Sequence, residues 1–158
     1  MNSLLGALLW SLFLLLSLVL HGKEESRRLA EYRGLCRLAE HLRCALTHAP
    51  EPLGAIYERF TDDALARVGF LTLLKEKGLA HALASGVLHL EGEELAPFHA
   101  YAAGLGTRLY TEEKLATEQL LAAVTAHLTQ KETTLPVRRK LASTLFFSGG
   151  MLLLLLLL

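Results

Sequence analysis

Four side chains of the kinds that bind zinc fall within one short stretch of the chain: Cys36, His41, Cys44 and His48. On a single helix they would spread over about 18 Å, and Cys36 and Cys44 would point about 80° apart. One ion cannot reach all four, so isolated polar residues are the favoured interpretation. A site built from Cys44, His48 and another helix is the alternative. The two sulfurs would lie about 12 Å apart along the helix, too far for a disulfide, which predicts free thiols in a reducing compartment.

Three carboxylates at the start of a predicted helix could ligate a hard cation or supply an acid and a base: Glu91, Glu93 and Glu94. Acidic residues at a helix start more often stabilise the helix dipole and face solvent, and that interpretation is favoured. The glycines of segment 104–106 lack the spacing and the Lys-Ser/Thr pair of a phosphate-binding loop. The seven histidines form no His-Glu-x-x-His pattern, and no serine lies in a nucleophile elbow. We therefore expect no enzyme activity, no cofactor and no metal site.

Charged residues are confined to the middle of the chain. All 16 Lys plus Arg and all 16 Asp plus Glu fall between Lys23 and Lys140. The uncharged segments 4–20 and 141–158 are each close to the ~20 residues that cross a hydrocarbon core of ~30 Å. Both are predicted to be transmembrane helices. The alternative for the first is a cleaved secretory signal, which the absence of a preceding Lys or Arg disfavours, and for the second a buried core helix.

Basic residues gather next to both predicted spans: Lys23, Arg27 and Arg28 follow the first, and residues 138–140 precede the second. Because basic residues near a span favour the cytoplasmic side, the middle of the chain is expected in the cytoplasm of a multi-pass cell-membrane protein. The predicted organisation is an N-terminal transmembrane helix at residues 1–22, a cytosolic helical bundle at 23–135 and a C-terminal transmembrane helix at 136–158.

The segments between the spans have helical spacing, without the alternation of a strand. The first predicted helix, residues 23–47, runs on from the first span and has an apolar face opposite Arg33, Arg37 and Glu40. That face consists of Tyr32, Leu35, Leu38, Ala39, Leu42 and Leu46. We expect it to pack in the core of the bundle.

Five further helices are predicted from cap and breaker residues. They begin at Pro52, after Thr61 as a cap, after Gly78, near Glu93 and at Thr111, and Pro136 then restarts the chain into the second span. The third helix, which ends at Gly78, is apolar on most sides and is expected at the centre of the bundle. The fold class is therefore all-α, a bundle of about six helices between two transmembrane helices.

The charge of the predicted bundle changes along its length. Segment 23–43 has six basic and four acidic residues, whereas segment 91–118 has two basic and six acidic residues. Ordinary positive-inside bias with a solvated face explains this pattern, but an acidic surface for a cytosolic partner is the functional interpretation. Its candidate residues are Glu91, Glu93, Glu94, Glu112 and Glu113. No basic cluster with interleaved aromatic residues indicates nucleic-acid binding.

Small residues in the two spans predict how these helices pack, because small side chains let helix backbones approach closely in lipid. Ser3, Ala7 and Ser11 recur every four residues in the first span, and Ser148, Gly149 and Gly150 cluster in the second. Ser11 and Gly149 would each lie about 12–13 Å from the cytoplasmic end of an antiparallel pair. We expect an intramolecular hairpin, and the alternative is that the glycines face another subunit.

Three short segments carry a family resemblance. Segment 145–151 runs into the C-terminal leucines as an apolar pair, Ser-Gly and a leucine-rich tail; segment 35–46 precedes the helix start at Pro52-Leu53; segment 101–106 has an aromatic residue and Leu-Gly. Together they resemble stage III sporulation protein AB of endospore-forming bacteria. The chain departs from the family at Thr107-Arg108-Leu109-Tyr110, where the family has a polar stretch with Asp. That departure puts any role of the missing Asp in doubt.

The resemblance implies a helical domain akin to the F platform protein of type II secretion and type IV pilus machines. It also implies a place on the mother-cell side of the channel between mother cell and forespore. There the chain would link a cytosolic secretion-type ATPase, similar to stage III sporulation protein AA, to other membrane channel subunits, and it could form a homo-oligomer. The alternative is a membrane-tethered sensor or regulatory adaptor that binds a small ligand or a signalling protein. A membrane enzyme is the least supported reading.

Overall fold

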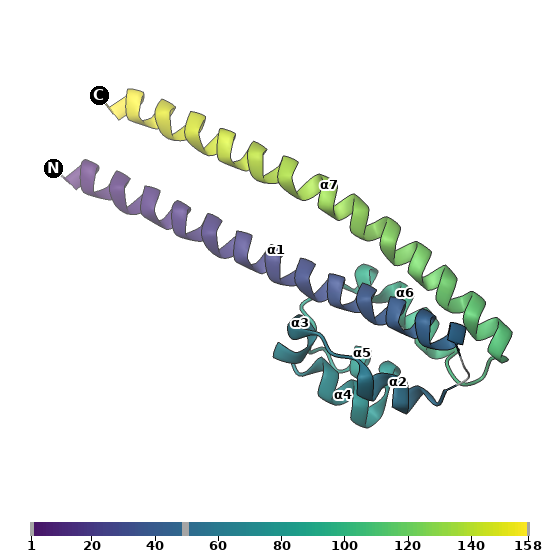
Figure 1. Cartoon of the computed structure of the whole chain (residues 1–158). Helices are drawn as coiled ribbons and strands as arrows, with labels where there is room; N and C mark the ends of the chain where they lie inside the picture. Colours follow the sequence, from purple (N-terminus) through teal and green to yellow (C-terminus); the bar gives the residue numbers. More distant parts are fainter. Residues whose placement is uncertain (1, 49–50, 158) are drawn as a thin grey trace. The chain divides into compact units, whose positions relative to one another are not determined.

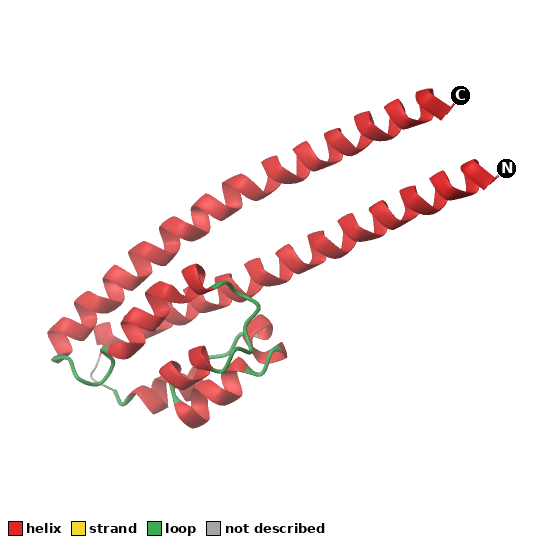
Figure 2. Ribbon diagram, turned by 180° about the vertical axis from the view of Figure 1, so that it is seen from behind, coloured by secondary structure: helices red, strands yellow, loops and turns green. Residues whose placement is uncertain are grey.

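The computed structural model describes the backbone of residues 2–48 and 51–157 and the side chains of Leu16, Val19, Leu20, 22–48 and 51–134. The described residues form α-helices without any strand (Figures 1 and 2), which confirms the all-α class. The helices are α1 (Asn2–His48), α2 (Leu53–Arg59), α3 (Asp63–Arg67), α4 (Phe70–Lys77), α5 (Leu79–Ala84), α6 (Gly92–Ala103) and α7 (Tyr110–Leu157).

The chain divides into two compact units. One consists of Met1–Glu24 with Thr129–Leu158, and the other is Glu25–Leu128. Among the side chains that the structure describes, no helix has an apolar stretch long enough to cross a membrane. The predicted spans, 4–20 and 141–158, lie almost entirely outside those side chains, so both spans stay predictions.

The two longest helices, α1 and α7, are unbroken across the predicted borders between the spans and the bundle. α1 is unbroken from Asn2 to His48, as expected for a first helix that runs on from the N-terminal segment. The prediction that Pro136 restarts the chain is wrong, because α7 is helical from Tyr110 to Leu157. A proline removes one backbone donor and disfavours helical geometry in the residue before it. In this long helix the turns on both sides continue in spite of that cost.

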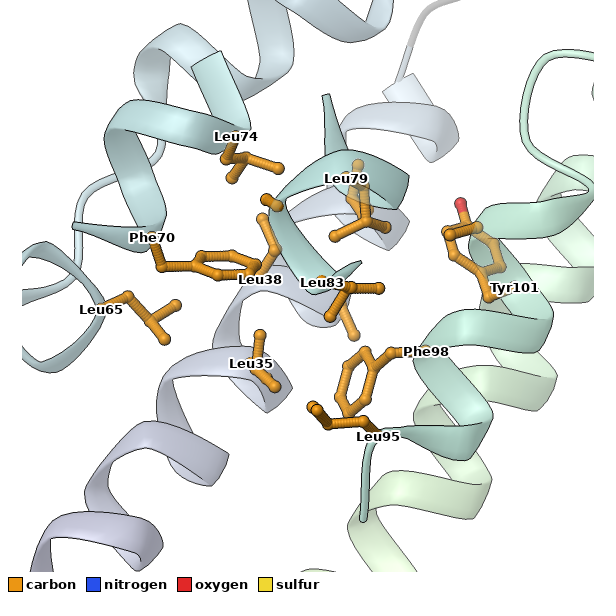
Figure 3. Packing of buried hydrophobic residues seen from close by; sticks show 14 of the residues in the cluster. Leu35, Leu38, Leu65, Phe70, Leu74, Leu79, Leu83, Leu95, Phe98 and Tyr101 are labelled. Carbon is orange, nitrogen blue, oxygen red and sulfur yellow. The ribbon is translucent and has the colours of Figure 1, made fainter. Parts of the chain in front are cut away.

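The predicted inner face of α1 is confirmed. All six of its apolar residues are buried, whereas Arg33, Arg37 and Glu40 on the opposite side are exposed. In Figure 3, Leu35 and Leu38 of α1 point into a cluster that includes Phe70 of α4 and Phe98 of α6. α4 contacts α2, α3 and α5, and α5 contacts α6, so consecutive short helices pack around one core.

The third predicted helix is divided in the structure. Gly69 has φ 78°, a left-handed conformation that glycine adopts without the steric cost of a Cβ, and it separates α3 from α4. The cap also differs from the prediction: Asp62, rather than Thr61, caps α3 and accepts hydrogen bonds from Ala64 N and Leu65 N, each at 3.0 Å. A carboxylate at this position satisfies two amide groups that the first turn would otherwise leave unpaired.

Asp62 also links the start of α3 to α1 through an ion pair with Arg37. Its Oδ2 accepts a hydrogen bond from Arg37 Nε at 2.8 Å and a second from Arg37 Nη2. The side chains of Asp62 and Leu65 pack so closely on the α1 backbone that a Cβ on Gly34 would lie 2.8 Å from Asp62 Oδ1 and 2.8 Å from Leu65 Cγ. The close approach of the two helices therefore depends on a glycine at position 34.

Gly34→Ala is expected to lower the free energy of unfolding by about 1–3 kcal/mol, because the added methyl group forces α1 and α3 apart. Urea denaturation of the full-length chain in mild detergent, followed by circular dichroism, measures this change. Gly54→Ala is the matched control, since no atom lies within 4 Å of a Cβ at that position. Equal stability of the two variants would contradict the close-approach argument.

The remaining predicted boundaries agree only in part. Gly78 ends α4, with φ 81° and its N–H bonded to Leu74 O, as predicted. The apolar spacing after Gly78 predicts a helix that includes Leu79, Leu83, Val87 and Leu90, but α5 ends at Ala84, and Val87 and Leu90 follow it in a connecting segment. A proline is expected in or close to the first turn of a helix, but Pro97 lies inside α6, five residues beyond its first residue.

Candidate functional site

The five predicted partner-surface carboxylates do not form one surface. Glu94 and Glu113 are buried, which corrects the expectation that they face a partner, whereas Glu91, Glu93 and Glu112 are exposed. Glu91 to Glu94 lie at the start of α6, and Glu112 and Glu113 lie in the first turn of α7. α6 has 12 residues and is therefore about 18 Å long, and α7 begins near its far end. The acidic residues thus form two separate groups.

The group at the start of α6 has a structural role. Glu91 and Glu94 form a capping box, in which Glu91 N donates to Glu94 Oε2 at 2.7 Å. Glu91 Oε1 also accepts a hydrogen bond from Arg28 Nη1 of α1 at 2.7 Å. These contacts cap α6 and tie its start to α1. Glu93, which lies between Glu91 and Glu94, is exposed and takes no part in these contacts.

A second carboxylate, that of Glu31 on α1, forms hydrogen bonds with the segment before α6. Glu31, which is 1% exposed, accepts hydrogen bonds from the backbone N of His89 at 2.7 Å and from its ring Nδ1 at 2.9 Å. Arg27 Nε lies 3.4 Å from Glu31 Oε1, one helical turn earlier. The bond to Nδ1 orients the imidazole of His89 and directs its other ring nitrogen away from Glu31. Sequence reasoning missed this pair, although Glu31 occupies a position on the apolar side of α1.

The most unusual polar group lies where α2, the end of α6 and the start of α7 meet. We call it the Glu113 cluster, and its members are Tyr57, Tyr101, Arg108, Glu113 and Thr117. Tyr101 OH and Thr117 Oγ1 are 3.0 Å apart, and Arg108 lies over the Tyr101 ring, 5.7 Å from its centroid. Arg108 Nη1 is 3.8 Å from Glu113 Oε1, within range of an ion pair.

Three buried oxygen atoms in the Glu113 cluster have no hydrogen bond of regular geometry within the described structure: both carboxylate oxygens of Glu113 and the hydroxyl of Tyr57. Buried polar groups are normally hydrogen-bonded, so these atoms could accept or donate bonds to a small polar molecule. Burial, and then the charge of Glu113, raises the pKa of Tyr57 to about 12. Burial is also the main cause that raises the pKa of Tyr101 well above its usual value. Both phenols are therefore neutral hydrogen-bonding groups at neutral pH.

Tyr57→Phe is expected to change the free energy of unfolding by less than about 0.5 kcal/mol or to raise it slightly, because the hydroxyl removed has no hydrogen bond. Tyr101→Phe is the matched comparison. It removes the bond to Thr117 and should cost about 0.5–1.5 kcal/mol. Urea denaturation of both variants measures the difference. A larger loss for Tyr57→Phe than for Tyr101→Phe would contradict the assignment of an unpaired hydroxyl.

Alkaline pH is expected to destabilise the bundle through its buried tyrosines. Burial, with a smaller effect of Cys36, raises the pKa of Tyr32 to about 12, and that of Tyr57 is raised to about 12 as well. Because an unfolded tyrosine has a pKa of about 10, the folded state holds these protons more tightly. The stability that they contribute is complete below about pH 10 and is lost as the pH rises through about 12. Tyrosinate absorbance and circular dichroism, recorded together, test this, and ionisation of every tyrosine near pH 10 without loss of helicity would contradict it.

The cysteines and histidines considered for zinc do not assemble in the described structure. Cys36 and Cys44 are free thiols, and Cys36 Sγ faces Val124 O at 4.0 Å. His41 Nε2 lies 3.2 Å from Ile56 O, and His48 Nδ1 lies 2.8 Å from Cys44 O. No group of three or more possible metal ligands occurs among the described residues.

The residues predicted to pack the two spans fall outside the described side chains: Ser3, Ala7, Ser11, Ser148, Gly149 and Gly150. Their packing stays a prediction. No protein-family model, curated protein or solved structure matches this chain. The resemblance to stage III sporulation protein AB therefore also stays a prediction, and function has to be argued from the chain itself.

Proposed function

We propose that this chain is a non-enzymatic membrane component that serves as an assembly platform. Two uncharged ends of membrane-spanning length flank a middle segment, residues 23–140, that carries all the charged residues, and this pattern is the observation on which the proposal rests. The all-helical fold of that domain is compatible with a scaffold that presents helix faces to other proteins. In this proposal the domain faces the cytoplasm and the ends anchor it in the cell membrane.

The resemblance to stage III sporulation protein AB supports a more specific form of the proposal. The chain would link a cytosolic secretion-type ATPase to other membrane subunits of the channel between mother cell and forespore. Deleting the gene in a spore-forming host should then block sporulation after engulfment, and expression of the chain should restore it. Purification of the tagged full-length chain from sporulating cells should recover the ATPase and membrane subunits. Normal spore yield after deletion would overturn the proposal.

The membrane orientation has its own test, which uses a native residue. Cys44 is exposed in the described structure, whereas Cys36 is half-buried. A membrane-impermeant thiol reagent should label Cys44 in inverted membrane vesicles but leave it unlabelled in intact protoplasts. A Cys44→Ser variant identifies the labelled residue. Labelling in intact protoplasts would place the helical domain on the opposite side of the membrane.

The predicted hairpin of the two spans is tested by crosslinking. Ser11→Cys and Gly149→Cys, introduced together into a chain that lacks Cys36 and Cys44, should form a disulfide within one chain. Ser11→Cys with Leu155→Cys is a control pair, because the second position lies about 9 Å further along its helix. Crosslinks found only between chains would support glycines that face another subunit.

The alternative proposal, a membrane-tethered sensor or regulatory adaptor, is favoured by one observation, the three buried oxygens of the Glu113 cluster that have no hydrogen bond of regular geometry within the described structure. Two carboxylate acceptors beside a phenol suit a small donor such as a primary amine. Methylammonium chloride should then raise the thermal midpoint of the full-length chain relative to sodium chloride of equal ionic strength, and Glu113→Gln should abolish the difference. Equal midpoints in the two salts would remove the support for this alternative.

A further inference from the structure

The first half of α7 has one face in the core and one face that no described residue covers. Its inner stripe, at helical spacing, consists of Glu113, Thr117, Leu120 and Val124, all of them buried. On the opposite side, the midline of the helix is formed by Leu115, Ala122 and Ala126, which are all exposed. Leu115 is 56% exposed, and Leu109, which precedes the helix, is 71% exposed. We call this side the α7 outer face, and its residues are Leu109, Glu112, Leu115, Glu118, Ala122 and Ala126.

The shape of the α7 outer face suits a second helix. The distance between packed helices depends on the side chains at the contact, and alanine permits a close approach. A single exposed leucine would be ordinary for a protein surface. Here Leu115, Ala122 and Ala126 follow one another at intervals of seven and four residues, the spacing of a continuous helix stripe. Leu115 would be the one large apolar anchor and the alanines would form the flat part of the contact.

The charges that border this stripe define the chemistry of the occupant. Within residues 109–130 the exposed charged side chains are Glu112 and Glu118, which flank the midline on its two sides, whereas Lys114 is half-buried. Glu112 Oε2 also accepts a hydrogen bond from Leu109 N at 3.2 Å, which holds it at the start of the helix. A partner with Lys or Arg on both sides of an apolar stripe complements this pattern.

The same charges argue against a second copy of this chain as the occupant. Two α7 outer faces in contact would place Glu112 and Glu118 of both chains in one interface, where residues 109–130 offer no exposed Lys or Arg to pair with them. The exposed side of α1 is basic, with Arg33 and Arg37, but it offers no exposed large apolar residue between positions 23 and 48. It therefore lacks a counterpart for Leu115.

We propose that the α7 outer face is a docking surface for a basic amphipathic helix of another protein. This surface would add a partner-binding site to the proposed function. The inference rests on that function only where it takes the partner to be a subunit of the assembled machine. It also replaces the acidic surface that the sequence predicted: Glu112 remains in it, Leu115 and Glu118 join it, and Glu91, Glu93, Glu94 and Glu113 do not belong to it.

A pair of synthetic peptides tests the proposal. One is an amphipathic helix of roughly 18 residues built from Leu, Ala and Lys, and the other has the same apolar stripe with Glu in place of Lys. Fluorescence anisotropy with the full-length chain in lipid nanodiscs should show binding of the basic peptide and at least about tenfold weaker binding of the acidic one. Both affinities should converge when the salt concentration rises from roughly 0.1 to 0.5 M.

Variants of the chain locate the contact. Glu112→Lys with Glu118→Lys, and separately Ala122→Arg, should each weaken binding of the basic peptide by at least about tenfold. Glu76→Lys on α4 and Ala66→Arg on α3 are matched controls at exposed positions and should change it by less than about twofold. Unchanged circular dichroism spectra show that the variants fold.

The outcomes separate the inference from the proposed function. Equal binding of both peptides, or binding of the basic peptide that Ala122→Arg leaves unchanged, would overturn the docking surface. Neither result would affect the proposed function, which a sporulation defect of the deletion strain would still support. Self-association of the chain in sedimentation experiments that Ala122→Arg abolishes would identify a second copy as the occupant and overturn the basic-helix proposal. Conversely, specific binding of the basic peptide with normal spore yield would retain the surface and reject the sporulation platform.

Discussion

Phe98→Ala is expected to lower the free energy of unfolding of the helical domain by about 3–5 kcal/mol. Phe98 is 1% exposed and lies among the buried residues of α1, α5 and α6 (Figure 3). Its ring packs edge-on against Tyr32 of α1, with centroids 6.2 Å apart and planes at 84°. Truncation removes this aromatic contact as well as the buried apolar area, and it leaves a cavity that the surrounding helices fill only in part.

Urea denaturation of the full-length chain in mild detergent, followed by circular dichroism, measures this loss. Leu109→Ala is the matched control, because Leu109 is 71% exposed and its truncation should change the free energy by less than about 0.5 kcal/mol. Similar losses for the two variants would contradict the position of Phe98 in the core.

The second large effect is expected for Asp62→Ala, at about 2–4 kcal/mol. The Asp62 side chain is 2% exposed and makes two sets of contacts. It caps α3 through Ala64 N and Leu65 N, and it holds Arg37 of α1 through Nε and Nη2. Removing it leaves amide groups at a helix start without partners and releases the ion pair with Arg37 that joins α1 to the start of α3.

Two neighbouring substitutions make this prediction specific. Thr61→Ala and Asp63→Ala lie on either side of Asp62 and both residues are exposed, so each should cost less than about 0.5 kcal/mol. Arg37→Ala should cost less than Asp62→Ala, because it removes the ion pair but leaves the cap in place. The same denaturation experiment compares all four variants. A loss for Thr61→Ala as large as that for Asp62→Ala would instead support the cap predicted from the sequence.

The core of the helical domain could be predicted from the sequence because its longest helix has a regular pattern. Six apolar residues at helical spacing on α1 are all buried. The short helices were harder to delimit. Val68 and Phe70 continue an apolar run on both sides of Gly69, so periodicity alone indicated one helix where a left-handed glycine produces two. Whether a glycine breaks a helix depends on tertiary packing, which a sequence pattern does not contain.

The polar sites were predicted less well than the core. The sequence predicts that acidic residues near a helix start face solvent, which is correct for Glu93 and Glu112 but wrong for Glu94 and Glu113. Glu113 is spaced four and seven residues from the buried Thr117 and Leu120, and this spacing was the available signal that it lies on the inner face. Its neighbours Tyr57 and Arg108 come from distant or irregular parts of the chain, so their convergence on Glu113 required the three-dimensional fold.

The brevity of α2, α3, α4 and α5, which have 7, 5, 8 and 6 residues, has a consequence for how the domain opens. Helices of this length are unstable in isolation, since nucleation is costly and each gains few backbone hydrogen bonds. None of the four can therefore persist once its neighbours detach. Residues 53–84 should therefore behave as one cooperative unit whose amide protons exchange with solvent together. The middle of α1 should stay protected during such partial openings, because it belongs to a much longer helix and has six buried apolar residues.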